Sequence, residues 1–561
     1  MIRLALAACL LAAAPAGGAD GVLDDDTRTF AARVDGDALG LVGVQYNARI
    51  AALDTVARDQ LDQMFGRKTL DSLPPAVAFL EVFFLAGHYA DKPVIYVREK
   101  TMRAFVRKHL DAGSAKTFDR TNRLPPAALL DEEAWHLLTR AGRADAADRQ
   151  RVRGVRSLRD ALPQLADRKE FRVAIDRLSA RYAGFLATEL LRVAPSSGDR
   201  WLTVEKAFDL APSAATQPGS ADNVAVAWAA LRNAWRARDA QRVNDLVARI
   251  DRLLADRAPG VYPSRRTRSL ERLYNRTNQF TLVWIGFAVA LVPLILAAAS
   301  GRRWARRVGM GVFALSTLVM LGGFAVRWLI SGRAWYLPPI MNQFEAVVGS
   351  ALLGSVVAIV LELAWRKNYF ALGASLYATI ALLSGLIFPE QMGAGIRAQH
   401  GILSSPVMAA HVAVIIIGHA LVGITFFLSL VYLGAWTLAG AGPEASAPAD
   451  LRAAGQLSTL AVIDRCNLIV AQLACWTVIV GTILGAYWGD FAWGRWWGWD
   501  PKETWALITC LVYVILLHVR FVTPKRSRGV VTAAICLVGC LAMLFNWIIV
   551  NYVLAGKHSY A

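Results

Sequence analysis

Five tryptophans lie within thirteen residues between Trp493 and Trp505, where the chain reads Trp-Gly-Arg-Trp-Trp-Gly-Trp-Asp-Pro-Lys-Glu-Thr-Trp. Tryptophan is large and amphipathic, so a cluster of it beside an apolar segment builds either an interfacial belt or a flat platform for a planar ligand. A belt needs no fixed residue order. The ordered motif, followed directly by the Asp500 carboxylate, therefore favours the platform.

Histidines are the second group of residues that could bind a ligand or a metal. His411, His518 and His558 lie in or beside apolar segments of the second half. An ionisable group within a membrane span is costly and usually functional, and neutral imidazole is a common metal ligand. For His419, a helix-to-helix hydrogen bond is the expected role. For His400, in a polar loop, we expect a solvated side chain.

The composition of the chain indicates which class of protein fold positions these residues. The chain has 561 residues and is 55% hydrophobic, which indicates a membrane protein with an additional soluble part. The net charge of +18 is compatible with nucleic acid, but no nucleic-acid-binding motif accompanies it, so we expect no such partner. Apart from Cys9, the cysteines lie in apolar segments, where cysteine acts as a small hydrophobe, and we expect no disulfide in the soluble part.

The apolar segments predict a mainly α fold, a polytopic bundle of about eight spans preceded by a mostly helical domain. Each holds roughly the 17–25 apolar residues that a bilayer core requires. We expect spans at 279–299, 308–330, 344–364, 369–388, 406–435, 466–488, 503–519 and 530–555. The expected domains are a signal peptide at 1–19, a soluble domain at 20–275 and a membrane domain at 276–561 that contains the tryptophan loop at 489–505.

Two signals predict the orientation. Residues 1–19 have a charged start, a short apolar core and small residues before a polar segment, as a secretory leader does, although an uncleaved leader remains an alternative. Alternate loops between the spans are rich in arginine and lysine, which marks them as cytoplasmic. Both signals place the soluble domain, the tryptophan loop, His411 and His558 outside the cytoplasm, and His518 near the cytoplasmic end of its span.

The soluble domain shows no phosphate-binding glycine loop, metal-ligand cluster or nucleophile motif. Its periodicity predicts helices at 98–110, 132–141, 156–192 and 223–255, with short strands at 44–50 and 94–97.

The motif Gly-x-Trp-Trp-x-Trp-Asp-Pro resembles the tryptophan-rich "WWD" signature of heme-handling proteins, and its continuation Lys-Glu-Thr-Trp resembles the CcsA (ResC) family of cytochrome c biogenesis proteins. Met-Ala-Ala-His at 408–411, the His558 tail and Leu-Leu-His at 516–518 also resemble segments of this family. The resemblance covers about 275 to the end.

This resemblance implies a heme b, transient or bound, with His411 and His558 as axial ligands at an outer site and His518 as a buried histidine on the route from the cytoplasm. Such a ligand requires an aromatic wall and cationic partners for its propionates. We expect Trp493, Trp496, Trp497 and Trp499 to flank the ring. Arg327 is expected either to meet a propionate or to snorkel to the interface, and Arg495 is an alternative propionate partner. Asp500 and Glu503 are expected to cap the next helix.

The resemblance further implies a bacterial inner-membrane protein of the system II pathway that attaches heme to the Cys-x-x-Cys-His segment of an apocytochrome c. If catalytic, it is a holocytochrome c synthase acting with a CcsB (ResB) subunit, and a thioredoxin-like reductant is a further expected partner. Two alternatives remain open: a heme exporter or chaperone without ligation activity, and a redox subunit with permanent heme.

Overall fold

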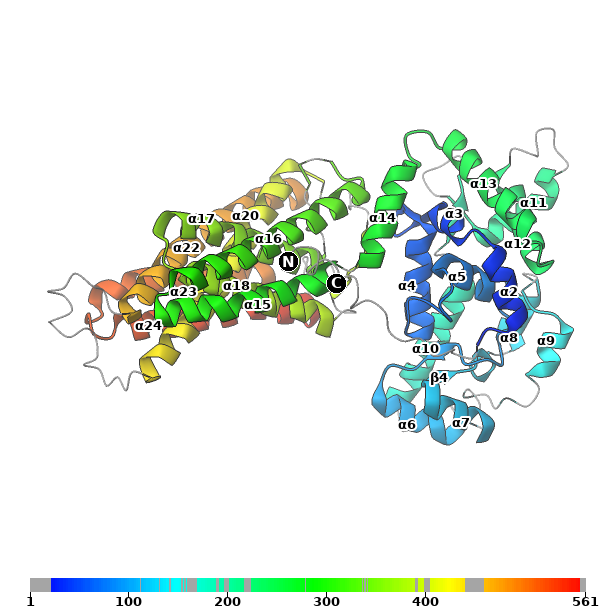
Figure 1. Cartoon of the computed structure of the whole chain (residues 1–561), viewed down its shortest axis with the longest axis horizontal. Coiled ribbons are helices and arrows are strands. Elements are labelled where there is room, and N and C mark those ends of the chain that lie inside the picture. Colours follow the sequence, from blue (N-terminus) through cyan, green and yellow to red (C-terminus); the bar gives the residue numbers. More distant parts are fainter. Residues whose placement is uncertain are drawn as a thin grey trace. The chain divides into compact units, whose positions relative to one another are not determined.

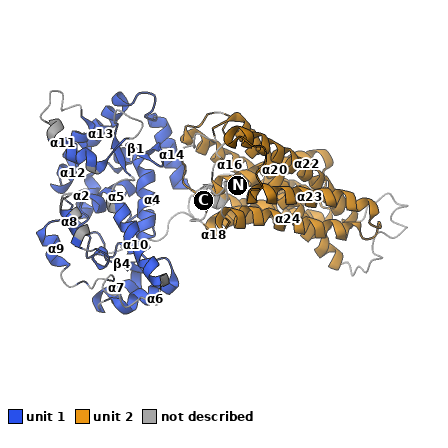
Figure 2. Cartoon of the chain, turned by 180° about the vertical axis from the view of Figure 1, so that it is seen from behind, with its two compact units in different colours: residues 1–277 blue, residues 278–561 orange. Residues whose placement is uncertain are grey.

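The structure is a computed structural model. It describes residues 22–554 except 111, 131, 141–142, 153–154, 156–157, 159–168, 188–190, 196–200, 216–222, 278, 335, 338–339, 341, 389–391, 398–403 and 439–458. The predicted leader and His400 therefore lie outside the described residues, as does His558. The chain divides into two compact units, residues 1–277 and 278–561, coloured separately in Figure 2.

The first unit is mostly helical with two small antiparallel sheets, labelled in part in Figure 1. Its helices are α2 (Asp25–Arg33), α3 (Gly36–Leu41), α4 (Leu53–Phe65), α5 (Pro75–Phe84), α6 (Lys100–His109), α7 (Ala112–Thr121), α8 (Glu132–Arg140), α9 (Ala146–Arg151), α10 (Lys169–Ala187), α11 (Val204–Ala215), α12 (Val224–Arg236), α13 (Ala240–Arg257) and α14 (Arg265–Thr277), with a 3-10 turn η1 (Pro126–Ala128). Its strands are β1 (Gly43–Tyr46), β2 (Arg49–Ala52), β3 (Ile95–Tyr96), β4 (Arg123–Leu124), β5 (Arg192–Ala194) and β6 (Leu202–Thr203), in the orders β2-β1-β5-β6 and β3-β4.

Three sequence predictions for this unit are wrong in detail. The helix expected at 156–192 is observed as α10 at Lys169–Ala187, and Arg192 belongs to strand β5. The strand expected at 44–50 is a hairpin, because Asn47 and Ala48 adopt φ values of 50° and 60°, as a two-residue hairpin turn requires. The helix expected at 223–255 is two helices, α12 and α13. Arg238 between them is left-handed with φ 56°, and Asp239 caps α13 by accepting a hydrogen bond from the backbone N–H of Arg242 at 3.0 Å.

Helix α5 lies at the centre of the first unit, and all of its side chains are buried. Its one carboxylate, Glu81, is satisfied within the core. It accepts hydrogen bonds from Arg238 at 2.7 Å, from the Trp235 indole at 2.8 Å and from the Tyr89 hydroxyl at 2.8 Å. Because a buried charge without partners is unstable, these contacts explain how α5 carries a carboxylate.

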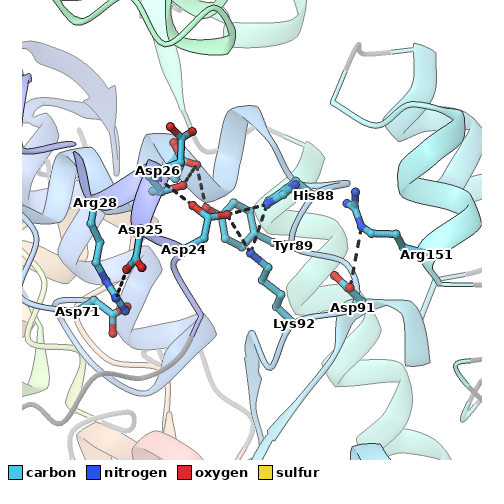
Figure 3. Close-up of polar contacts among 12 residues, drawn as sticks. Asp24, Asp25, Asp26, Arg28, Asp71, His88, Tyr89, Asp91, Lys92 and Arg151 are labelled. Atoms are coloured by element: carbon cyan, nitrogen blue, oxygen red, sulfur yellow. Dashed lines mark hydrogen bonds and ion pairs between the residues drawn. The ribbon is translucent and has the colours of Figure 1, made fainter. Parts of the chain in front are cut away.

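A surface cluster around Asp24 fixes the start of α2 (Figure 3). The Asp24 carboxylate accepts the backbone N–H of Thr27 at 2.8 Å and lies 3.3 Å from His88 Nε2 and 3.7 Å from Lys92 Nζ. Partial burial opposes ionisation, but the hydrogen bonds from Thr27 and the charge of Lys92 outweigh it and hold the pKa of Asp24 well below its usual value. This cluster is explained by helix capping and indicates no chemistry.

The second unit is a bundle of eight long apolar helices among the described residues, which confirms the predicted polytopic membrane fold. They are α15 (Gln279–Ser300), α16 (Arg303–Ser331), α17 (Gln343–Trp365), α18 (Tyr369–Ile387), α20 (Pro406–Leu438), α22 (Thr459–Trp493), α23 (Pro501–Val522) and α24 (Arg528–Tyr552). Each coincides with one predicted span. Helix α22 is longer than expected and includes Trp493.

The bundle has two groups of helices joined through α20. Helices α15, α16, α17 and α18 pack together, as do α20, α22, α23 and α24, while α17 and α18 also pack on α20. Outward-facing side chains such as Val292, which is 71% exposed, are apolar, as lipid contact requires. Small residues allow the close approach of α20 and α22: Gly418 of α20 faces Val478, and Gly481 of α22 faces Ile415.

Candidate functional site

His411 lies in a slot that two glycines of α22 create. Its side chain, in the second turn of α20, is half-buried, and its Nδ1 donates a hydrogen bond to the carbonyl oxygen of Gly481 at 2.7 Å. One turn further along α22, a Cβ added to Gly485 would lie 2.6 Å from Cε1 of His411. The ring therefore occupies space that any residue larger than glycine would fill.

This hydrogen bond determines the tautomer of His411. A carbonyl oxygen only accepts, so Nδ1 carries the proton and the ring lone pair is on Nε2. Histidines that bind metals commonly donate the other ring N–H to a backbone carbonyl, which fixes the ring orientation and raises the basicity of the ligating nitrogen. His411 therefore has the protonation and the support that an axial iron ligand requires.

The tryptophan loop lies between the end of α22 and the start of α23. Trp496 and Trp499 are 53% and 71% exposed, and Trp493 and Trp497 are half-buried. The rings contact one another and the last turns of α22: Trp497 meets Trp499 edge to face at 5.9 Å, and Trp496 lies 5.6 Å from Tyr487. The loop thus presents an aromatic surface at the end of the bundle to which the His411 slot also belongs.

Asp500 and Glu503 hold this loop in place. They form a capping box at the start of α23, which confirms the predicted role. Asp500 accepts the backbone N–H of Lys502 at 2.9 Å, and Glu503 accepts those of Gly498 at 2.7 Å and Asp500 at 3.2 Å. Trp499, which lies between Gly498 and Asp500 in the chain, has a left-handed backbone conformation with φ 56°. Both carboxylates are thus occupied by backbone donors.

Arg327 is held inside the bundle. Its guanidinium donates to Glu345 of α17 at 2.7 Å and to the carbonyls of Ala394 and Gly395 at 2.9 and 3.1 Å. The side chain is 1% exposed, so the snorkelling alternative is wrong. Glu345, which sequence reasoning missed as its partner, also accepts a hydrogen bond from Arg333 at 3.1 Å.

Arg495, the other predicted propionate partner, packs over Gly498 within the loop, and its Nε is buried without a hydrogen-bond partner among the described residues.

His419 and His518 differ in their surroundings. His419 is buried and accepts a hydrogen bond from the Trp547 indole of α24 at 2.9 Å, which confirms the predicted helix-to-helix contact. His518 lies about 25 Å further along α23 from Pro501 on the helical rise. Its side chain is exposed on the bundle surface and bonds only locally, to the Val514 carbonyl at 2.8 Å. In this chain alone it is therefore not the buried residue that the resemblance implies.

Several elements with predicted site residues meet at one end of the bundle. His411 of α20 contacts Gly481 and Gly485 of α22, and Trp496 of the tryptophan loop lies beside Tyr487, two residues beyond Gly485. Lys502 at the start of α23 donates to Asn551 at the end of α24 with a distance of 2.8 Å. The tail that carries His558 follows α24, although that residue lies outside the described part. Among the described residues, no group of three His, Cys, Asp or Glu side chains is placed to hold a metal.

Comparison with known proteins shows what the membrane unit is similar to. Residues 340–558 match the family model described as "Cytochrome C assembly protein". The cytochrome c biogenesis protein CcsA of a Synechococcus strain is 29% identical over 304 residues, covering 50% of this chain and 95% of that protein. CcsA of Nandina domestica is 25% identical over 314 residues, covering 50% of this chain and 94% of that protein. The membrane unit is therefore similar to cytochrome c assembly proteins, CcsA among them.

Two other similar proteins are matched over less than half of their length. Protein NrfI of Wolinella succinogenes is 30% identical over 316 residues, which is 54% of this chain but only 32% of NrfI, so the chain spans about a third of that relative. The solved structure of cytochrome c heme lyase CcmF aligns with 48% of this chain and 45% of its own at a TM-score of 0.35 and 15% identity, a likeness too distant to place any residue.

Sequence reasoning missed some polar residues of this helix bundle. Gln343 and Asn551 connect α17 to α24, and Asp464 forms a two-point ion pair with Arg520 of α23 at 2.8 and 2.9 Å. The signal that could have found them is a polar side chain inside an otherwise apolar span, which is expensive unless it has a partner.

Proposed function

We propose that this protein receives heme b and attaches it to the two thiols of an apocytochrome c Cys-x-x-Cys-His segment at the end of the bundle that carries the tryptophan loop. The observation that carries the proposal is His411, whose Nδ1–H is held by the Gly481 carbonyl beside an exposed aromatic surface. That arrangement suits a flat macrocycle whose iron takes neutral imidazole.

The residues have separate roles in this proposal. His411 and His558 hold the iron from opposite sides, and Trp493, Trp496, Trp497 and Trp499 flank the ring. Asp500 and Glu503 keep the loop in shape through the backbone of the α23 start. His518, exposed on α23, contributes to an inner site only together with a second subunit of the CcsB (ResB) type, which would cover that surface.

The proposed reaction needs little general acid or base catalysis. Each thiol adds across one vinyl double bond, the sulfur bonds to one carbon, the hydrogen goes to the other, and nothing leaves. Holding thiol and vinyl groups together removes much of the entropic barrier of such an addition. Both thiols must be reduced, which is why a thioredoxin-like reductant is part of the proposal.

The proposed orientation has the tryptophan loop on the outer face of the bacterial inner membrane, with the first unit also outside. Its support is the charge of the loops. Those at the opposite end of the bundle include Arg302 before α16 and Lys525 and Arg526 before α24. Four more arginines lie in the first turns of the helices that follow: Arg303, Arg306 and Arg307 in α16 and Arg528 in α24. Positive loops stay in the cytoplasm.

The test is co-expression with an apocytochrome c and the CcsB-type subunit, followed by staining for covalent heme. We expect holocytochrome with the wild-type chain and with the control His136→Ala, whose side chain is exposed in the first unit, and background staining with His411→Ala. If wild-type protein carries heme but yields no covalent product, a heme exporter, chaperone or redox subunit replaces this proposal.

A further inference from the structure

Lys502 is a cation in an unusual position. It lies in the first turn of α23, directly after the tryptophan loop, and its side chain points across the bundle to α24 and is largely covered. Its Nζ donates to Asn551 Oδ1 at 2.8 Å and forms no ion pair with a carboxylate of any described residue. The nearby Asp500 and Glu503 carboxylates accept backbone N–H groups instead.

The direct hydrogen-bond partner of Lys502 supplies no negative charge, and the Asp500 carboxylate acts on the ammonium only from beyond ion-pair distance. Asn551 is neutral and donates through Nδ2 to Gln343 Oε1 of α17 at 3.2 Å.

A covered ammonium with only a neutral partner is costly, because desolvation removes more than one hydrogen bond to an amide returns. An anionic partner would offset that cost through a charge-assisted hydrogen bond. The expected partner is a carboxylate that enters from the loop end of the bundle on a ligand able to lie against the apolar and aromatic side chains there.

Lys502 is also connected to α20, the helix of the predicted iron ligand. Asn551, which accepts from Lys502, donates to the Trp547 carbonyl at 2.9 Å, and the Trp547 indole donates at 2.9 Å to His419, about two turns along α20 from His411. Asn551 stands in the last turn of α24, before the tail that carries His558. A ligand between the two proposed axial histidines would therefore have Lys502 within its neighbourhood.

We propose that Lys502, supported by Asn551, forms a subsite for one propionate of the heme. This rests on the proposed function, and it gives Lys502 a role that sequence reasoning had not assigned. A simpler interpretation is that the hydrogen bond only connects α23 to α24. It predicts that any side chain able to donate a hydrogen bond to Asn551 will bind heme as tightly as lysine does.

The experiment separates charge from hydrogen bonding. Full-length protein, purified in detergent, is titrated with heme and with heme dimethyl ester, in which both propionates are neutral. Lys502→Gln keeps a donor for Asn551 but removes the charge. We expect it to weaken heme binding about tenfold to a hundredfold and to leave ester binding unchanged, since a hydrogen bond to a charged group is worth roughly 1.5–3 kcal/mol.

Two control variants and a stability measurement test whether the loss of charge alone explains the change in affinity. Lys502→Arg keeps the charge and is expected to retain the preference for heme over its ester. Lys525→Gln, in the exposed loop at the other end of α23, should change neither affinity. Thermal midpoints measured on the same samples establish that the variants are folded.

Equal weakening of both ligands by Lys502→Gln, or no weakening of either, overturns the propionate subsite while leaving the heme site intact. Wild-type protein that binds neither ligand overturns the proposed function and the subsite together.

Discussion

Glu345 is the residue on which the buried charges of α16 and α17 depend. It accepts hydrogen bonds from Arg327 at 2.7 Å and Arg333 at 3.1 Å. Glu345→Gln removes the carboxylate that the two guanidinium groups share, and removing one partner of a buried charge network costs about 3–5 kcal/mol. We expect a lower thermal midpoint and reduced yield, whereas Glu99→Gln, on an exposed side chain, should change neither. An unchanged midpoint for Glu345→Gln would show that this network does not stabilise the bundle.

For individual residues, some roles could be predicted from the sequence and others could not. The capping roles of Asp500 and Glu503 follow from local spacing alone, so they were predictable. The partner of Arg327 was not, because Glu345 lies on another helix and only the packing of α16 against α17 brings them together. His419 was predictable as a helix-to-helix contact, but its partner Trp547 was not.

Among the elements, the crossing of α20 and α22 determines where the His411 ring lies. A Cβ at Gly485 would lie 2.6 Å from that ring, so Gly485→Ala must displace it. We expect the bound heme of this variant to show an altered Soret band and about tenfold weaker affinity, comparable to the loss of a supporting contact at a metal site. Gly434→Ala, also on a helix of this pair but with nothing within 4 Å of the added Cβ, is the matched control. Identical spectra for both variants would mean that His411 is not a ligand.

The helix boundaries show which helices could be predicted from hydrophobic patterning alone. The eight apolar helices of the described chain were predictable because each is long and continuous. The break between α12 and α13 was not, because it depends on left-handed Arg238, a conformation for which arginine gives no sequence signal. The glycine slot for His411 was also hidden, since it exists only once two distant helices cross.

For the whole molecule, we propose a heme site at the end of the bundle that carries the tryptophan loop, close to α20, α22 and the end of α24. The two-unit organisation and the membrane fold are properties of the chain. The pairing of His411 with His558 is the central proposal, because the described residues end at 554, before the second ligand.

The most direct measurement is the absorption spectrum of the purified full-length protein beside His411→Ala and His558→Ala. The account predicts a six-coordinate bis-histidine spectrum for the wild type and loss of that signature in each variant, with recovery when free imidazole is added. Wild-type spectra in both variants would contradict it.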